Sequence, residues 1–103
     1  MQQVTNGDYT ERQQALTEAL LRAIKQQLED VDAPPELVQK LTGSIGFAVT
    51  SLIDGVASAD YGGQELNPIL GFSIGAEQLL HAGGNSWMHE YVYRILPRLF
   101  PAE

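Results

Sequence analysis

The sequence predicts an all-α fold, a compact bundle of about four helices with close packing through glycine, alanine and serine. Two observations support it. Apolar residues recur every three or four positions along most of the chain, whereas strand-like alternation is poor. Residues 41–59 combine apolar side chains with repeated small residues, and small residues at helical spacing let helix backbones approach closely. A chain of 103 residues suits one domain, residues 1–103, and we expect residues 1–9 to form a flexible tail.

The first helix is expected from about Thr10 to Val31. Thr10 and Gln13 fit a capping box, in which each side chain satisfies a backbone donor of the first turn. Its apolar stripe, with a spacing of four residues, consists of Leu16, Leu20, Ile24 and Leu28. Pro34 then ends this element, because a residue before proline is disfavoured in helical conformation. Pro35 suits the first turn of the next helix, where its missing N–H is not needed.

The second helix is expected to be central and enclosed, because two apolar stripes cover much of its circumference. The main stripe consists of Leu37, Leu41, Ile45, Ala48, Leu52 and Val56, and the neighbouring one of Val38, Val49 and Ile53. Gly43, Gly46 and Gly55 each cost about 1 kcal/mol relative to alanine in a helix. Such a cost is tolerated where a neighbouring helix needs the space; a kink near Gly43 or Gly55 is the alternative.

Two further helices are expected after a loop at residues 60–66. Asn67 and Pro68 form a good helix start, and Gly83-Gly84 would close this third helix. Gly71 and Gly75 are expected at a close helix crossing. The fourth helix would begin at Asn85 or Ser86 and kink or end near Leu96, because Pro97 clashes with the preceding turn.

The charge of the chain disfavours two classes of partner. Thirteen acidic residues accompany six basic ones, for a formal net charge of −7. Nucleic acids and anionic membranes attract clustered Lys and Arg, so we expect neither as a partner. The absence of cysteine excludes disulfides and thiolate chemistry. It is compatible with a cytoplasmic location, which we expect because the polar N-terminal residues do not resemble a signal peptide.

Two histidine-containing patterns are candidates for chemistry. Glu77 and His81 would share a helix face, either as an acid–base pair or as a surface pair near a helix end. His89-Glu90 resembles the start of a zinc-protease motif, but Tyr93 occupies the position of the second histidine. We therefore expect no metal site and no cofactor, and assign no catalytic residue.

Asp54 is the one charged residue among residues 41–59. A buried carboxylate without a partner is costly, which leaves three alternatives. Asp54 faces solvent on a narrow polar strip, or pairs with Arg94 or Arg98 in a structural ion pair, or is a functional carboxylate.

Two surfaces are candidates for binding a partner. The last helix is rich in aromatic residues, namely Trp87, Tyr91 and Tyr93, and Arg94 adjoins them. This helix therefore either completes the core or forms an interface. Four acidic residues form a cluster at the turn between the first two expected helices, and this acidic cluster either binds a basic partner or is simply solvated. It consists of Glu29, Asp30, Asp32 and Glu36.

These features favour a small acidic helical protein-interaction module of the antidote, immunity, inhibitor or adaptor type. It would act by stoichiometric binding to another protein, to a second copy of itself, or to both. A homodimer is expected because several helices carry more apolar surface than a small bundle can cover. The alternative is a small enzyme or ligand-binding bundle that uses Glu77 and His81, or Asp54, in an internal pocket.

Overall fold

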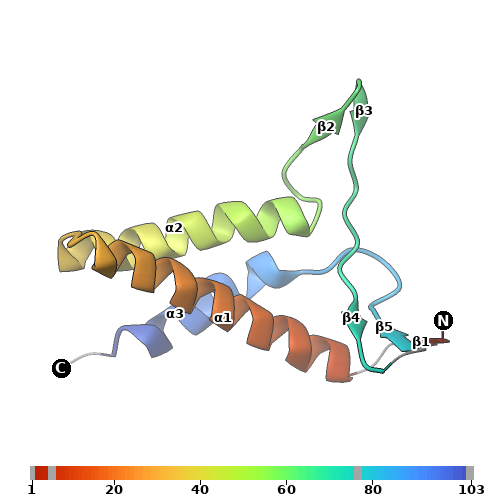
Figure 1. Ribbon diagram of the computed structural model, residues 1–103, viewed down its shortest axis with the longest axis horizontal. Coiled ribbons are helices and arrows are strands. Elements are labelled where there is room, and N and C mark those ends of the chain that lie inside the picture. Colours follow the sequence, from red (N-terminus) through yellow and green to blue (C-terminus); the bar gives the residue numbers. More distant parts are fainter. Residues whose placement is uncertain (1, 5–6, 76–77, 102–103) are drawn as a thin grey trace.

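The computed structural model describes residues 2–4, 7–75 and 78–101. Within these ranges the chain forms three α-helices and one short 3-10 helix. The helices are α1 (Gly7–Asp30), α2 (Pro35–Ile53), η1 (Met88–Glu90) and α3 (Val92–Leu99). The strands are β1 (Gln2–Val4), β2 (Asp60–Tyr61), β3 (Gln64–Glu65), β4 (Phe72–Ser73) and β5 (Gln78–Leu80). The described part of the chain is therefore mixed α and β (Figure 1).

The predicted all-α bundle of four helices is wrong, and the error lies in the expected third helix. Strand β4 pairs antiparallel with β5, which in turn pairs parallel with β1, in the sheet order β1-β5-β4. Gly71 and Gly75 would each destabilise a helix at residues 67–82 by about 1 kcal/mol relative to alanine. The aromatic Phe72 and the β-branched Ile74 favour extended structure. Gly75 has a φ of +147°, so no helix passes through it and the expected helix crossing is also wrong. Residues 2–4, in the expected tail, form β1.

A second small sheet projects from the helices as a hairpin, visible at the top of Figure 1. Strands β2 and β3 pair antiparallel, with Tyr61 opposite Gln64. Gly62 and Gly63 connect them with φ angles of +57° and +85°. A two-residue hairpin turn of this type needs positive φ at both positions, which glycine adopts without steric cost.

Helices α1 and α2 lie side by side, and α3 packs against both. As the sequence predicts, α2 begins at Pro35. The core between α1 and α3 consists of Leu21, Tyr91, Val92, Ile95 and Leu99. Helix α3 continues past Pro97, which is exposed, to Leu99.

Helix α2 approaches this core through its small residues. A Cβ atom at Gly46 would collide with the Leu21 side chain, and one at Gly43 would lie 2.8 Å from Leu96 Cδ2. The buried residues of α2 are Val38, Thr42, Gly43, Gly46, Thr50 and Ser51. The Thr50 hydroxyl donates to the Gly46 carbonyl oxygen within the helix (2.8 Å). Small side chains thus form the inner face of α2.

The expectation that the main apolar stripe of α2 lies in the core is wrong. Leu37 is 42% exposed, Ile45 38% and Leu52 45%. These positions lie on the opposite side of the helix from Thr42, Gly46 and Thr50, because a turn contains 3.6 residues. Close packing of the small side has placed the large side chains outward. No helix among the described residues is long and apolar enough to cross a membrane.

We predict that Gly46→Leu lowers the free energy of unfolding by about 2–3 kcal/mol, because the new side chain overpacks the contact with Leu21. Urea denaturation followed by circular dichroism measures the change. The control is Ala23→Leu, since Ala23 is exposed on α1 and its replacement should shift stability by less than about 0.5 kcal/mol. Equal stability of the two variants would show that α2 does not need a small residue at position 46.

Candidate functional site

A buried polar network centres on Asp54, the residue that caps the C-terminus of α2. Its side chain has no exposed surface. Its carboxylate accepts a hydrogen bond from Ser86 Oγ (2.5 Å) and one from the backbone N–H of His89 (2.7 Å). The carboxylate also lies 2.5 Å from His89 Nδ1. These donors offset the cost of removing a carboxylate from water.

This environment contradicts two of the three interpretations that the sequence left open for Asp54. Asp54 lies on no solvent-facing strip, and the side chain that it contacts is His89 rather than Arg94 or Arg98. Because Asp54 Oδ2 is an acceptor, Nδ1 of His89 carries the shared proton, and Nε2 is the other ring nitrogen. Sequence reasoning missed His89 as the partner, since 35 residues separate it from Asp54.

Tyr9, at the start of α1, belongs to the same region. Its hydroxyl donates to the Leu70 carbonyl oxygen (2.9 Å), and its ring packs against Phe72 and Trp87, each with a centroid distance of 5.6 Å. Burial raises the pKa of Tyr9; a hydrogen bond with Ser86 lowers it, and the negative charge of Asp54 raises it further. The phenol is therefore held in its neutral form.

A further hydrogen bond joins residues 86–89 to α1. The backbone N–H of Trp87 donates to Oε1 of Gln13 (3.0 Å), whose side chain is fully buried in α1. Residues 86–89 are thus fastened to α1 through Gln13 and to the end of α2 through Asp54.

The Asp54–His89 pair has the arrangement in which a carboxylate orients an imidazole for proton transfer. The ring of Phe47 packs against His89 at a centroid distance of 6.0 Å, with nearly perpendicular planes. Neither hollow described below is lined by Asp54 or His89. Because Asp54 accepts hydrogen bonds from Ser86 and from the backbone of His89, we interpret the network as a structural clamp that holds residues 86–89 against the end of α2. Among the described residues, no cluster of three or more His, Cys, Asp or Glu side chains has the arrangement of a metal site.

The expected pairing of Glu77 with His81 required a helix, but residues 78–80 form strand β5. Glu77 lies outside the described residues, and His81 follows strand β5. His81 Nδ1 accepts a hydrogen bond from the backbone N–H of Gly83 (2.8 Å), within its own turn.

The aromatic residues of the last segment divide between core and surface. Tyr91 belongs to the core, and Trp87 packs against that core and donates from Nε1 to the Tyr91 hydroxyl (2.6 Å). Arg94 lies over the Tyr91 ring, 5.5 Å from its centroid. Tyr93 is 57% exposed. Tyr93 and Arg94 are thus the members of this candidate surface that solvent reaches most readily.

The acidic cluster surrounds the turn between α1 and α2, and all four side chains are exposed. Glu29 pairs with Lys25 (3.3 Å), and Asp30 accepts a hydrogen bond from Gln26 (2.8 Å). Asp32, in a left-handed conformation with a φ of +59°, has no ion pair among the residues that the structure describes.

An outward face of α2 is the surface that sequence reasoning missed. We call it the outer α2 face; it consists of Leu37, Leu41, Ser44, Ile45, Ala48 and Leu52. No residue of this face carries a charge, and Leu41 alone among them is half-buried rather than exposed. Beside it, the exposed Phe47 ring packs against Tyr93 of α3, with centroids 5.9 Å apart. The signal was present in the sequence as the small residues Thr42, Gly46 and Thr50 on the other side of the helix.

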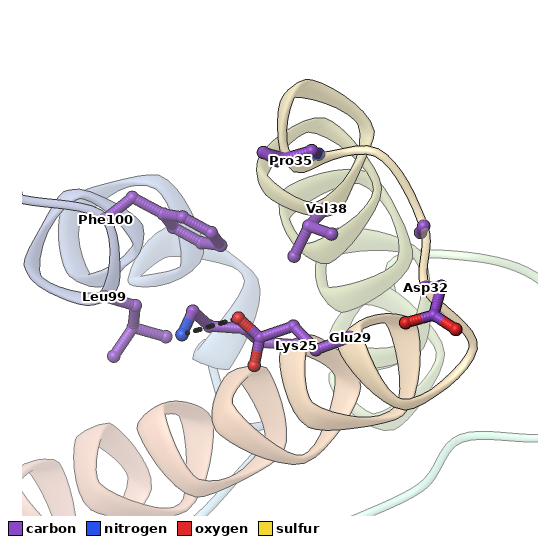
Figure 2. A pocket seen from close by; sticks show the side chains of 8 residues that line it. Lys25, Glu29, Asp32, Pro35, Val38, Leu99 and Phe100 are labelled. Carbon is purple, nitrogen blue, oxygen red and sulfur yellow. Dashed lines mark ion pairs between the residues drawn. The ribbon is translucent and has the colours of Figure 1, made fainter.

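Two hollows lie near the turn between α1 and α2. The first, of about 410 Å³, opens between the end of α1, the start of α2 and the end of α3 (Figure 2). The second is lined by Glu36, Gln39, Lys40, Ser44, Tyr93 and Leu96. Both therefore adjoin members of the acidic cluster.

Comparisons of the chain with protein-family models, with curated proteins and with solved structures gave no significant match.

We predict that Asp54→Asn destabilises the protein by about 3 kcal/mol, because an amide nitrogen cannot accept the bonds that the carboxylate accepts. Thermal and urea unfolding measure this loss. Asp60→Asn, in the exposed hairpin strand β2, is the control and should change stability by less than about 0.5 kcal/mol. A clamp role for Asp54 is ruled out if the two variants unfold alike.

We further predict that Tyr9 makes the fold sensitive to alkali. Its folded pKa is raised, so its contribution is complete below the unfolded value of about 10 and is lost as the pH rises from there through the folded pKa. Above pH 10 the parent should therefore lose stability faster than Tyr9→Phe, measured by urea unfolding at stepped pH. Tyr61→Phe, at a position 79% exposed, should behave like the parent. A parallel decline of Tyr9→Phe and the parent would contradict the assignment.

Proposed function

We propose that this chain is a small protein-interaction module that acts by stoichiometric binding, and that its outer α2 face binds the same face of a second copy. The observation that carries the proposal is the exposure of Leu37, Ile45 and Leu52 on a face without charge. Apolar surface in a continuous patch is typical of an interface. Each of these side chains would contribute on the order of 1 kcal/mol when covered, since each is already partly buried.

Charge favours a second copy at this face. Two chains of net charge −7 repel each other, so a stable self-interface needs a region in which acidic side chains do not meet. Most of the outer α2 face provides such a region, because no charged residue lies between Lys40 and Asp54, and only Leu37 lies beyond this stretch, between Glu36 and Lys40.

The side-chain sizes on this face also suit a helix crossing. Ser44 and Ala48 are small and lie one turn apart, with Leu41, Ile45 and Leu52 around them. Two copies of α2 can therefore cross closely at Ser44 and Ala48, while the larger side chains interdigitate around that point. A two-fold axis at the crossing would give each copy the same contacts.

The proposed interface moves the binding surface from the last helix to α2. Tyr93 contributes to its edge through Phe47, whereas Tyr91 is buried in the core and belongs to no binding surface in this proposal. A module of this kind fits the antidote, immunity, inhibitor or adaptor classes, and we place it in the cytoplasm. We favour it over a small enzyme, because the ring of His89 is packed against Phe47.

We predict that the parent protein sediments as a dimer at micromolar concentration and that Ile45→Glu sediments as the 11.3 kDa monomer. Burying two glutamates at the crossing would cost several kcal/mol, whereas exposed Ile45 is not needed inside the fold. Sedimentation equilibrium measures the mass, and circular dichroism checks that the helices persist.

Gln27→Glu is the matched control, since it adds the same charge at an exposed position on α1 and should remain dimeric. A parent protein that is monomeric at high micromolar concentration would refute self-association. A parent dimer that Ile45→Glu leaves intact would place the interface elsewhere.

A further inference from the structure

The first hollow combines an apolar base with a charged rim. Val38 and Leu99 are buried at its base, and Phe100 covers one side (Figure 2). Lys25 and Glu29 lie along the α1 side, and Asp32 lies at the far edge, on the turn into α2. The remaining lining residues are Ala33 and Pro35.

The hollow already holds one cation beside its aromatic ring. The Lys25 ammonium lies 5.4 Å from the centroid of the Phe100 ring and 3.3 Å from Glu29 Oε2. Ring and carboxylate together thus form a position for a positive charge, which the protein's own lysine occupies. Asp32 adds a second carboxylate, so the lining residues carry a net negative charge.

We propose that this hollow binds an arginine side chain of a basic partner protein, at a site separate from the outer α2 face. The aliphatic part of arginine would lie against Val38 and Leu99, and its planar guanidinium would stack on Phe100. Glu29 would accept hydrogen bonds from the guanidinium, and Asp32, at the far edge of the hollow, would add negative charge to the rim. Arginine suits the site better than lysine because a guanidinium is flat, weakly hydrated and able to bond two carboxylate oxygens at once.

The charges on the rim exclude the opposite kind of occupant. An acidic side chain would meet Glu29 and Asp32, with Asp30 and Glu36 exposed nearby, and would have Lys25 alone as a partner on this rim. A basic segment would instead meet carboxylates on both sides of the turn. The acidic cluster thus sets the sign of the partner, and the apolar base sets the shape of the side chain.

Lys25 occupies the position of the proposed guanidinium and would therefore compete with the incoming arginine. Lys25→Gln should tighten binding by about threefold, because it frees both Glu29 and the ring of Phe100. Arg12→Gln removes the same charge from an exposed position near the start of α1 and should leave binding nearly unchanged.

The experiment is a titration of the full chain with N-acetyl-L-argininamide, followed by NMR chemical shifts. Shifts should concentrate at Ala33, Val38 and Phe100, and N-acetyl-L-citrullinamide, which has the same shape without the charge, should bind at least about threefold more weakly. Glu29→Gln and Asp32→Asn should each weaken binding by about threefold. Glu18→Gln is their control, because Glu18 pairs with Arg22 in the same way outside the hollow.

Three results would overturn the proposal: shifts centred away from the hollow, equal binding of the citrulline compound, or equal weakening by Glu18→Gln and Glu29→Gln. Repeating the titration with Ile45→Glu separates this site from self-association. Unchanged binding by that variant supports an independent site, and lost binding would show that the hollow needs the dimer and overturn its separateness.

Discussion

The close approach of α2 to α1 and α3 is the constraint on which the rest of the structure depends. Leu21 and Leu96 occupy the space that side chains at Gly46 and Gly43 would need. The small residues of α2 face the core. Leu37, Ile45 and Leu52 lie on the opposite side of the same helix and therefore face away from the core. The outer α2 face follows from this packing, and with it the proposal that a second copy covers it.

Asp54 holds residues 86–89 in place, a short segment whose regular structure is limited to the 3-10 helix η1. Residues 86–89 precede α3 and orient the helix that completes the core; Met88 is buried, and Trp87 packs against the core cluster. A buried carboxylate that accepts bonds from Ser86 and His89 fixes that segment to the end of α2. The same residue that resembles a catalytic carboxylate in the sequence thus supports the position of α3.

Local signals in the sequence predicted some elements and misjudged others. The turn at Pro34 and Pro35 and the existence of the first two helices were predictable, because proline and four-residue periodicity act within a few residues. The expected start of the first helix near Thr10 was wrong, since α1 begins at Gly7. The strands β4 and β5 were not predictable, since Asn67 and Pro68 can precede a loop as well as a helix, and the β1–β5 pairing joins residues far apart in the sequence. Periodicity likewise identified the stripes of α2 but not which stripe faces inward. Asp54 drew attention as a lone charge, whereas His89 required the fold.

The ties around Tyr9 and Gln13 also bear on the order in which the chain folds. Helices α1 and α2 meet across a turn of a few residues, so their contact closes a small loop and forms at little entropic cost. The Gln13–Trp87 bond spans 74 residues and the Tyr9–Leu70 bond spans 61. Contacts between such distant positions bring together chain ends that are rarely near each other before the rest is ordered. We therefore expect the helical pair to form first and the contacts of Tyr9 and Gln13 with distant residues to form after it.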